Sequence, residues 1–433
     1  MKEIHVKWLL LLTVILLLAF PAIQQRYLIV EEMKLDGAVI TSPKPSFSLN
    51  TFLQGEFQPK LTHYLNECFG FRSFAIRLNN DLQFRLFSVI QAQGVVAGKN
   101  GYLFERGYIE TYNGDDFIGI PSIRNKVEKI KFIQDTLEAR GIFFLIVIAP
   151  NKARYYSDYI PERLNKPLRP SNYEFYSRFA KEEGIHFFDV GPWFEKLRDT
   201  CRYPLITKLG THWSRYGMIL FVDSLSRLIE QQNGKDLPDM HINSVELVQS
   251  SHELDYDLAE GMNLLAPIQQ QPSALPIYVI DEVSKWKPRT MAIADSYYWV
   301  IWNDYLAEKY FSQPLFWYYF KELHQTGKGV IKTKEVDFKS KLFQQEVIIL
   351  IGTEFNLFNF GWGFIDKAYA ELNGTIYDDG IDEKQVREVE QTIRNSSEWL
   401  EAVTLKAQKF EIPLDSMIRI DAIYMVKRRQ ILK

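Results

Sequence analysis

Residues 141–152 read Gly-Ile-Phe-Phe-Leu-Ile-Val-Ile-Ala-Pro-Asn-Lys, and this stretch decides the fold class. Residues 142–149 are all apolar, which is typical of a strand buried on both faces of a sheet. The preceding segment, residues 123–140, has apolar residues at helical spacing and ends at Gly141, a usual residue just past a helix. A helix followed by a fully apolar strand predicts a parallel sheet covered by helices on both faces.

The same alternation of helix and apolar strand recurs along the chain. Helical spacing predicts helices over residues 173–183 and 216–231. Short apolar runs predict strands over residues 186–190, 290–294 and 346–351. No repeat of fixed length is present, which argues against a solenoid. We therefore predict an α/β/α sandwich of the flavodoxin-like type.

Polar residues follow three of the predicted strands. Asn151 and Lys152 follow the first strand, Asp295 and Ser296 follow the strand at 290–294, and Glu354 follows the strand at 346–351. Open α/β sheets bind ligands beyond the carboxyl ends of their strands. These side chains are therefore predicted to line one functional crevice.

Ser296 and His212 are the candidate catalytic pair. Ser296 comes at the end of a buried strand, and His212 lies in the separate segment Gly-Thr-His-Trp-Ser at residues 210–214. A serine becomes a nucleophile only when a base takes its proton, and histidine is the usual base. As alternatives, Ser296 could only cap the following helix, and His212 could be a core histidine.

Four segments together carry a family resemblance. They are residues 96–104 (Val-Ala-Gly-Lys-Asn-Gly-Tyr-Leu-Phe), 149–152, 210–214 and 294–298. From about residue 69 to about residue 354, the chain resembles the SGNH-hydrolase-like domain of the alginate O-acetyltransferase (AlgJ/AlgX-type) family. In that family the histidine lies in an Asp-Thr-His-Trp motif and precedes the nucleophile. This chain keeps the order, but Gly210 stands in place of the aspartate.

The resemblance implies an O-acetyltransferase in which Ser296 accepts an acetyl group and His212 acts as base and then as acid. It also implies a membrane-bound O-acyltransferase as acetyl donor and a polysaccharide as acceptor. With glycine at 210, we predict Glu354 as the acid that orients His212. Candidate substrate-binding residues are Asn151, Lys152 and Trp213.

Two alternative functions use the same sequence features. An acetyl-esterase would use the same residues with water as the acceptor. A glycan-binding or scaffolding subunit of an export complex, without catalysis, would explain the glycine at 210. The seven histidines form no H-E-x-x-H pair, so no metal and no cofactor are predicted. The net charge of −3 does not indicate nucleic-acid binding.

The N-terminus predicts a membrane segment. Lys2 and Lys7 precede an uncharged run at residues 8–23, slightly shorter than the roughly 20 residues that span a bilayer. Phe20 and Pro21 do not fit a signal-peptidase site, although a cleaved signal peptide is the alternative. We predict a single-pass anchor in the bacterial cytoplasmic membrane, with the catalytic domain outside the cytoplasm, in the periplasm or its equivalent.

The predicted organisation has four parts. They are a cytoplasmic tail and anchor at 1–23, a linker at 24–60, the SGNH-hydrolase-like domain at 61–355, and a helical extension at 356–433. Within these parts, residues 61–90 predict two helices, and residues 95–104 predict a hairpin with a turn at Lys99-Asn100-Gly101. Cys68 and Cys201 could form a disulfide or remain thiols.

Overall fold

The computed structural model describes residues 2–36, 43–249, 253–269, 271–375, 383–409 and 413–431. Residues 37–42 of the predicted linker, and residues 376–382, 410–412 and 432–433 of the predicted extension, lie outside these ranges. The chain divides into two compact units. The helical unit comprises Met1–Gln93, Glu260–Ile268 and Asp382–Val426, and the sheet unit comprises Gly94–Ala259, Gln269–Ile381 and Lys427–Lys433.

The predicted domain boundaries at residues 61 and 355 remain predictions. The sheet unit begins at Gly94. It also holds residues 356–375, which the sequence assigned to the extension.

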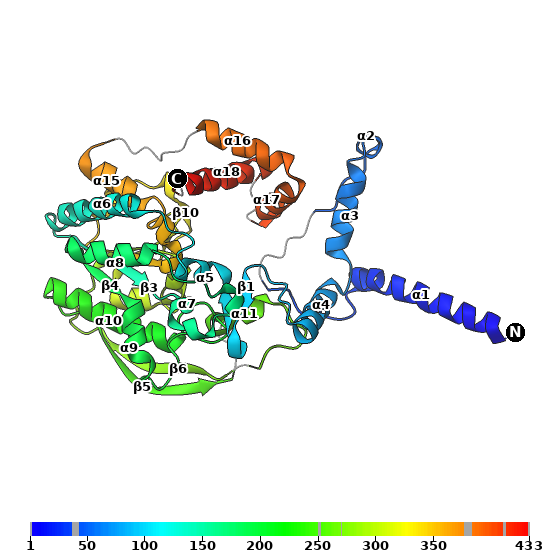
Figure 1. The fold of residues 1–433 in the computed structure, drawn as a ribbon, viewed down its shortest axis with the longest axis horizontal. Helices are drawn as coiled ribbons and strands as arrows, with labels where there is room; N and C mark the ends of the chain where they lie inside the picture. The colour runs from blue at the N-terminus through cyan, green and yellow to red at the C-terminus, as the bar shows by residue number, and fades with distance from the viewer. Residues whose placement is uncertain are drawn as a thin grey trace. The chain divides into compact units, whose positions relative to one another are not determined.

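The sheet unit is built on one mixed sheet with the strand order β10-β9-β8-β7-β11-β3-β4. Figure 1 labels β3, β4 and β10 of this sheet. Its strands are β3 (Phe143–Ala149), β4 (Phe187–Asp189), β7 (Arg289–Ala294), β8 (Ser312–Tyr318), β9 (Glu322–Gln325), β10 (Ile331–Lys332) and β11 (Val347–Thr353). Strands β8, β7, β11, β3 and β4 pair in parallel, and β9 and β10 continue the edge in antiparallel fashion. The predicted parallel sheet is confirmed.

Helices cover both faces of this sheet. The first face carries α6 (Ile120–Glu138), α8 (Asn172–Glu182), α14 (Phe338–Phe343) and α15 (Phe364–Asn373). The second carries α5 (Arg106–Tyr112), α7 (Lys152–Tyr155), α9 (Val190–Arg198), α10 (Arg215–Asn233), α12 (Trp299–Asn303) and α13 (Leu306–Tyr310). Alternate residues of β3 enter the two cores, because successive side chains on a strand point to opposite faces. The apolar run at 142–149 is therefore buried throughout.

Local signals explain where these elements begin and end. Ser171 and Ser214 cap α8 and α10 by accepting backbone N–H groups, which satisfies donors that a helix start leaves free. Gly234 ends α10 in the left-handed conformation. The predicted hairpin is present as β1 (Val95–Ala97) and β2 (Leu103–Glu105). Its turn places Asn100 at φ 54°, which asparagine tolerates better than most residues.

The sequence did not predict a long ribbon between α10 and β7. Strands β5 (Asp239–Val248) and β6 (Ser273–Asp281) pair in antiparallel fashion, and α11 (Glu253–Gly261) lies between them in the chain. Most side chains of β5 are exposed or half-buried, so the apolar pattern that identifies buried strands is absent here.

The helical unit contains α1 (Lys2–Tyr27), α2 (Leu49–Leu53), α3 (Phe57–Cys68), α4 (Arg72–Phe87), α16 (Glu383–Asn395), α17 (Ser397–Lys409) and α18 (Leu414–Ile431). The two helices predicted within 61–90 are confirmed as α3 and α4. Phe20 of α1 stacks on Phe71 with ring centroids 4.9 Å apart. Cys68 and Cys201 are free thiols.

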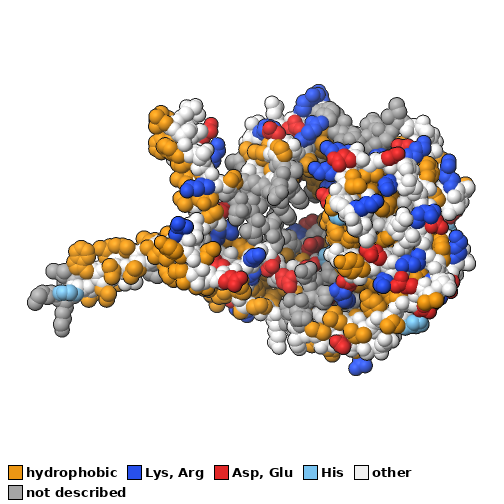
Figure 2. Space-filling model, turned by 180° about the vertical axis from the view of Figure 1, so that it is seen from behind, with side chains coloured by type: hydrophobic (Ala, Val, Ile, Leu, Met, Phe, Trp, Pro, Cys, Tyr) orange, Lys and Arg blue, Asp and Glu red, His pale blue; other side chains and the backbone are white. Residues whose placement is uncertain are grey.

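Helix α1 is the one element among the described residues that is long and apolar enough to cross a membrane. The candidate span is His5–Tyr27, and Figure 2 shows hydrophobic side chains along it. At 23 residues and about 1.5 Å per residue, the span is about 35 Å long, against about 30 Å for a bilayer core. A signal sequence near the N-terminus passes the same test of length and composition, so this feature is weak evidence for an anchor.

Candidate active site

The carboxyl end of β7 positions Ser296. The preceding residue, Asp295, is fully buried, and its Oδ1 accepts the backbone N–H of Tyr297 at 3.1 Å. Its Oδ2 accepts the N–H of Thr353 at 2.8 Å and the amide of Asn356 at 2.9 Å. Burial raises the pKa of Asp295, and these hydrogen bonds oppose the rise. Asp295 thus ties the ends of β7 and β11 together directly beside Ser296.

The structure brings His212 and Ser296 together. Nε2 of His212 lies 3.0 Å from Oγ of Ser296, within hydrogen-bond range. The loop carrying His212 is fixed by Tyr297, whose hydroxyl donates to the carbonyl of Thr211 at 2.8 Å and whose ring lies 4.8 Å from the imidazole. A residue next to the candidate nucleophile therefore also positions the candidate base.

The acid beside His212 is Asp257, which the sequence did not predict. Its Oδ2 lies 2.6 Å from Nδ1 of His212. Its Oδ1 accepts the N–H of Thr211 at 2.7 Å and that of Leu258 at 2.8 Å. One carboxylate thus orients the imidazole and holds the adjacent backbone. Because Asp257 lies in α11, 45 residues after His212, no local motif points to it.

The surroundings of His212 set its protonation. Burial by itself lowers the pKa of the imidazole, but the hydrogen bond and charge of Asp257, with Asp295 and Glu105 further away, raise it above the usual value. With Nδ1–H donated to Asp257, Nε2 is left to accept the hydroxyl proton of Ser296, a tautomer assigned from the hydrogen-bond network. This arrangement can activate a serine.

Glu354 was predicted to orient His212, and this prediction is wrong. In the structure Glu354 is paired with Arg154. Its two carboxylate oxygens accept hydrogen bonds from Nε and Nη2 of Arg154, both at 2.8 Å. Arg154 also lies over the ring of Tyr173, 4.4 Å from its centroid. Glu354 is 1% exposed, and a buried carboxylate requires such a paired cation. The carboxylate that contacts His212 is that of Asp257.

Asn151 and Lys152 contact protein groups in the structure. Asn151 caps α7 by accepting the N–H of Ala153 at 2.7 Å and donates to the carbonyl of Tyr108 at 3.1 Å. The ammonium of Lys152 donates to the carbonyl of Lys208 at 2.9 Å and also to that of Gly210. Both residues are almost fully buried. They support the loop and strand ends around His212.

Trp213 is also fully buried. Its ring stacks on Phe221 at 4.6 Å and meets Tyr297 edge-on at 5.0 Å. A backbone bridge joins Trp213 to Ile206. Trp213 therefore packs beneath the His212 loop. These contacts do not support the predicted contact between Trp213 and a substrate.

Two further residues border the candidate site, and sequence reasoning missed both. Glu105 is half-buried. Burial and the charge of Asp257 raise its pKa, whereas His212 and Lys152 lower it. The backbone N–H of Tyr319 donates to the carbonyl of Ala294 at 2.9 Å, two residues before Ser296. Both lie at ends of elements distant in sequence, so only the fold brings them to Ser296.

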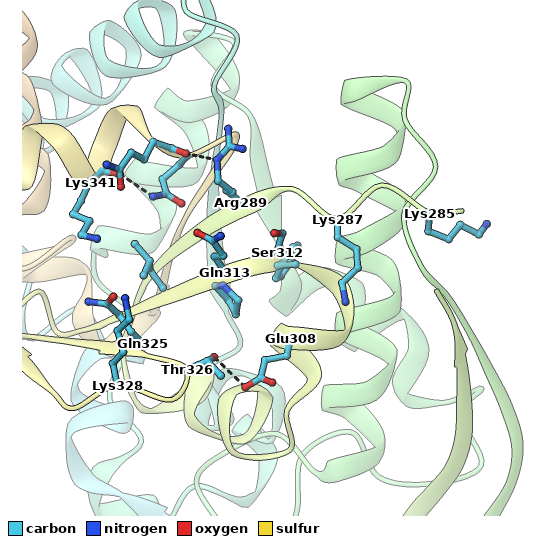
Figure 3. A pocket seen from close by; sticks show the side chains of 15 residues that line it. Lys285, Lys287, Arg289, Glu308, Ser312, Gln313, Gln325, Thr326, Lys328 and Lys341 are labelled. Carbon is cyan, nitrogen blue, oxygen red and sulfur yellow. Dashed lines mark hydrogen bonds between the residues drawn. The ribbon is translucent and has the colours of Figure 1, made fainter. Parts of the chain in front are cut away.

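A separate cleft of about 820 Å³ lies at the opposite end of β7 and β8 (Figure 3). Its lining includes Lys285, Lys287, Arg289, Glu308, Gln313, Lys328 and Lys341. Three of its cations already have acidic partners, because Lys285 binds Asp236, Lys287 binds Glu282 and Arg289 lies 3.5 Å from Glu346. The six residues of β7 place this cleft roughly 20 Å from Ser296. It is not the predicted crevice.

Comparisons with known proteins agree with the predicted class of fold. Residues 95–291 match the family model of the SGNH hydrolase-like domain, acetyltransferase AlgX, which defines the class of this domain. This match and two curated relatives support a domain of the AlgJ/AlgX type in this part of the chain.

Two curated relatives are each named as a probable alginate O-acetylase AlgJ. The one from Pseudomonas putida is 23% identical over 172 residues, which is 40% of this chain and 43% of the relative. The one from Pseudomonas aeruginosa is 27% identical over 148 residues, which is 34% of this chain and 35% of the relative. The chain thus spans less than half the length of these relatives.

Two solved structures are similar at low identity. The O-acetyltransferase domain of Pseudomonas putida AlgJ has a TM-score of 0.43 and 16% identity, with 64% of this chain and 99% of that chain covered. Pseudomonas aeruginosa AlgX has a TM-score of 0.40 and 12% identity, with 64% of this chain and 67% of that chain covered.

Proposed function

We propose that this protein is an O-acetyltransferase that moves an acetyl group through an acyl-enzyme on Ser296 to a hydroxyl of an exported polysaccharide. The observation that carries the proposal is the hydrogen-bonded series Ser296–His212–Asp257, with contacts of 3.0 and 2.6 Å. These are the nucleophile, base and orienting acid that acyl transfer requires. The match to the acetyltransferase AlgX domain model supports acetyl as the acyl group.

In the first half-reaction, His212 Nε2 takes the proton of Ser296 and Oγ attacks the carbonyl carbon of an acetyl ester donor. Asp257 stabilises the imidazolium that results, and the leaving group departs with the proton. In the second half-reaction, a sugar hydroxyl gives its proton to Nε2 and attacks the acetyl-serine. Ser296 then leaves and recovers its proton from His212.

The names of the relatives support the proposed acceptor, and the family resemblance implies the proposed donor. Those relatives are named as alginate O-acetylases, so a polyuronate hydroxyl is the proposed acceptor. A membrane-bound O-acyltransferase is the proposed donor. Helix α1, as an anchor, would hold the sheet unit outside the cytoplasmic membrane near that donor.

The alternative of a non-catalytic glycan-binding or scaffolding subunit was based on the glycine at position 210. Asp257 contacts Nδ1 of His212, where the motif aspartate would lie, so the glycine no longer favours that alternative. An esterase would use the same residues with water as the acceptor, so the two activities differ in the second half-reaction.

The test is acetylation of the full chain in detergent by an activated acetyl ester, followed by mass spectrometry of its peptides. We expect one acetyl group on Ser296 and none at this site in Ser296→Ala. The control is Ser312→Ala, a serine at the opposite end of the sheet, which should label like the parent.

Transfer is then distinguished from hydrolysis by adding an alginate oligosaccharide. A transferase should lose the label faster and yield acetylated oligosaccharide, whereas an esterase should release acetate at the same rate with or without the sugar. Equal labelling of the parent and Ser296→Ala would refute the proposal.

A further inference from the structure

The cleft at the opposite end of β7 and β8 from Ser296 has a lining of mixed chemistry. Five of its fifteen lining residues are lysine or arginine, and Glu308 is the one acid in this lining. Phe311, Pro314 and Leu315 add buried apolar side chains. Its volume of about 820 Å³ lies within the range of about 300–1,000 Å³ that is typical of ligand sites. The lining therefore favours a ligand with both negative charge and an apolar face.

Two of the lysines are free to pair with such a ligand. Neither a salt bridge nor a hydrogen bond joins Lys328 or Lys341 to an acid in the described part of the chain. In Figure 3, both lie on one side of Ser312, and Lys287 lies on the other. Lys287 is held by Glu282, which is outside the lining, at 2.9 Å. An ammonium group has three N–H donors, so Lys287 keeps donors for a ligand as well.

Neutral polar side chains of the lining also have hydrogen-bonding groups to offer. The side chains of Ser312, Gln313 and Gln325 make no hydrogen bond to other described residues. A side-chain amide both donates and accepts, and so does a hydroxyl. These side chains can therefore bind hydroxyl groups of a ligand, while the lysines bind its carboxylates.

A β-bulge presents Gln313 to the cleft. Where β7 pairs with β8, two residues, Gln313 and Pro314, oppose the single residue Thr290. Gln313 is exposed and has a φ of 50°, in the left-handed region that a Cβ atom makes unfavourable. Bulges bend a strand and re-aim a side chain, and they are frequent beside functional sites. Backbone strain persists where it positions a functional group, and here the positioned group is the amide of Gln313.

We propose that this cleft is a second binding site for a carboxylated polysaccharide, which holds the polymer while another segment of it reaches Ser296. A uronic-acid polymer carries the three kinds of group that the lining matches. Its carboxylates pair with Lys328 and Lys341, its hydroxyls with the neutral side chains, and the apolar C–H faces of its rings with the buried apolar residues. Binding in the cleft is independent of catalysis, whereas the role in acetyl transfer rests on the proposed function of Ser296.

The position of the cleft makes chain length decisive. Because roughly 20 Å separates it from Ser296, a short oligosaccharide occupies one site at a time, whereas a long chain can occupy both. Binding at one site then raises the effective concentration of the chain at the other. We expect a lower KM for a long alginate chain than for a short oligosaccharide.

The binding test is titration calorimetry of the full chain in detergent with an alginate oligosaccharide. We expect Lys328→Gln/Lys341→Gln to raise the Kd about 3- to 30-fold, because each contact between exposed charges contributes modestly. The effect should shrink at high salt, which screens such contacts. Lys328 is exposed and Lys341 is half-buried, so this variant should melt at the parental temperature.

The matched control is Lys332→Gln/Lys339→Gln. It removes the same charge from exposed lysines of β10 and α14 that do not line the cleft, so it should keep the parental Kd. Two further ligands test the chemistry of recognition. The carboxyl-reduced form of the oligosaccharide lacks the charge, and polyglutamate lacks the hydroxyl groups. Both should bind more weakly than the oligosaccharide itself.

Acetyl transfer tests the role of the cleft in catalysis. The measurement is KM for a long alginate chain and for a short oligosaccharide, in the parent and in Lys328→Gln/Lys341→Gln. The variant should lose most of the advantage of the long chain, because its second point of attachment is weakened.

The outcomes separate the two proposals. An unchanged Kd in Lys328→Gln/Lys341→Gln, an equal rise in the control variant, or equally tight binding of polyglutamate overturns the polysaccharide site. An unchanged ratio of the two KM values overturns its role in transfer. A parent that binds the oligosaccharide through the cleft but is never acetylated at Ser296 refutes the proposed function and leaves the binding site standing.

Discussion

At the scale of single residues, Asp257 fixes the tautomer of His212 and raises the pKa of its imidazole. Its carboxylate fixes Nδ1–H and stabilises the imidazolium, so Asp257→Asn should lower acyl transfer by about three to four orders of magnitude. The same change removes the main cause that raises the pKa of His212 and leaves burial, which lowers it. The base works when neutral, so the acidic limb of the rate profile should move to lower pH in Asp257→Asn.

A measurement of kcat/KM against pH in both proteins checks this prediction. Gly210→Asp serves as the comparison, and we expect no gain from it because Nδ1 of His212 already has a carboxylate partner. Two results would contradict the role of Asp257 as the acid that orients His212. One is a higher rate in Gly210→Asp, and the other is an acidic limb of the rate profile that stays at the parental pH in Asp257→Asn.

At the scale of elements, the buried Lys152 adds to the contacts that hold the loop carrying His212. Lys152 donates to the carbonyls of Lys208 and Gly210, and burial lowers its pKa to about 7. Lys152→Met keeps an unbranched side chain one atom shorter, but leaves both carbonyls without this donor. We expect a loss of about 1–3 kcal/mol in the free energy of unfolding, together with slower labelling of Ser296.

Denaturant unfolding and acetyl labelling measure the two effects. The control is Lys208→Met, which changes a side chain that lies over the ring of Tyr102 and leaves the carbonyl of residue 208 in place. It should retain parental labelling. If Lys152→Met labelled at the parental rate, the loop would not depend on this contact.

Element boundaries were predictable where a repeating physical signal exists. The apolar run of β3 and the helical spacing of α6 each identify an element, and the observed bounds differ from the predicted ones by only a few residues. The pair β5 and β6 carries no such signal, because its side chains are mostly exposed or half-buried. The strained backbone at Gln313 also breaks local preference, so sequence patterns point away from it.

The whole molecule should be attached to the membrane through α1. If this helix is an anchor, the protein recovered from cells keeps its N-terminus and sediments with membranes after an alkaline wash. A variant without residues 2–27 should lose this attachment and, if exported by another signal, appear in the soluble fraction. Recovery of a soluble parental form that begins near residue 23 would instead indicate a cleaved signal peptide.

The sequence by itself determined the class of fold, a resemblance to the AlgJ/AlgX-type family, and the pair Ser296 and His212 as candidates. Each depends on a local pattern, such as a fully apolar strand with a polar residue at its carboxyl end. Only the tertiary structure decided the hydrogen-bond partners of His212 and Glu354. Asp257 reaches His212, and Arg154 takes Glu354, because a hydrogen bond depends on distance in space, which chain separations of 45 and 200 residues do not encode.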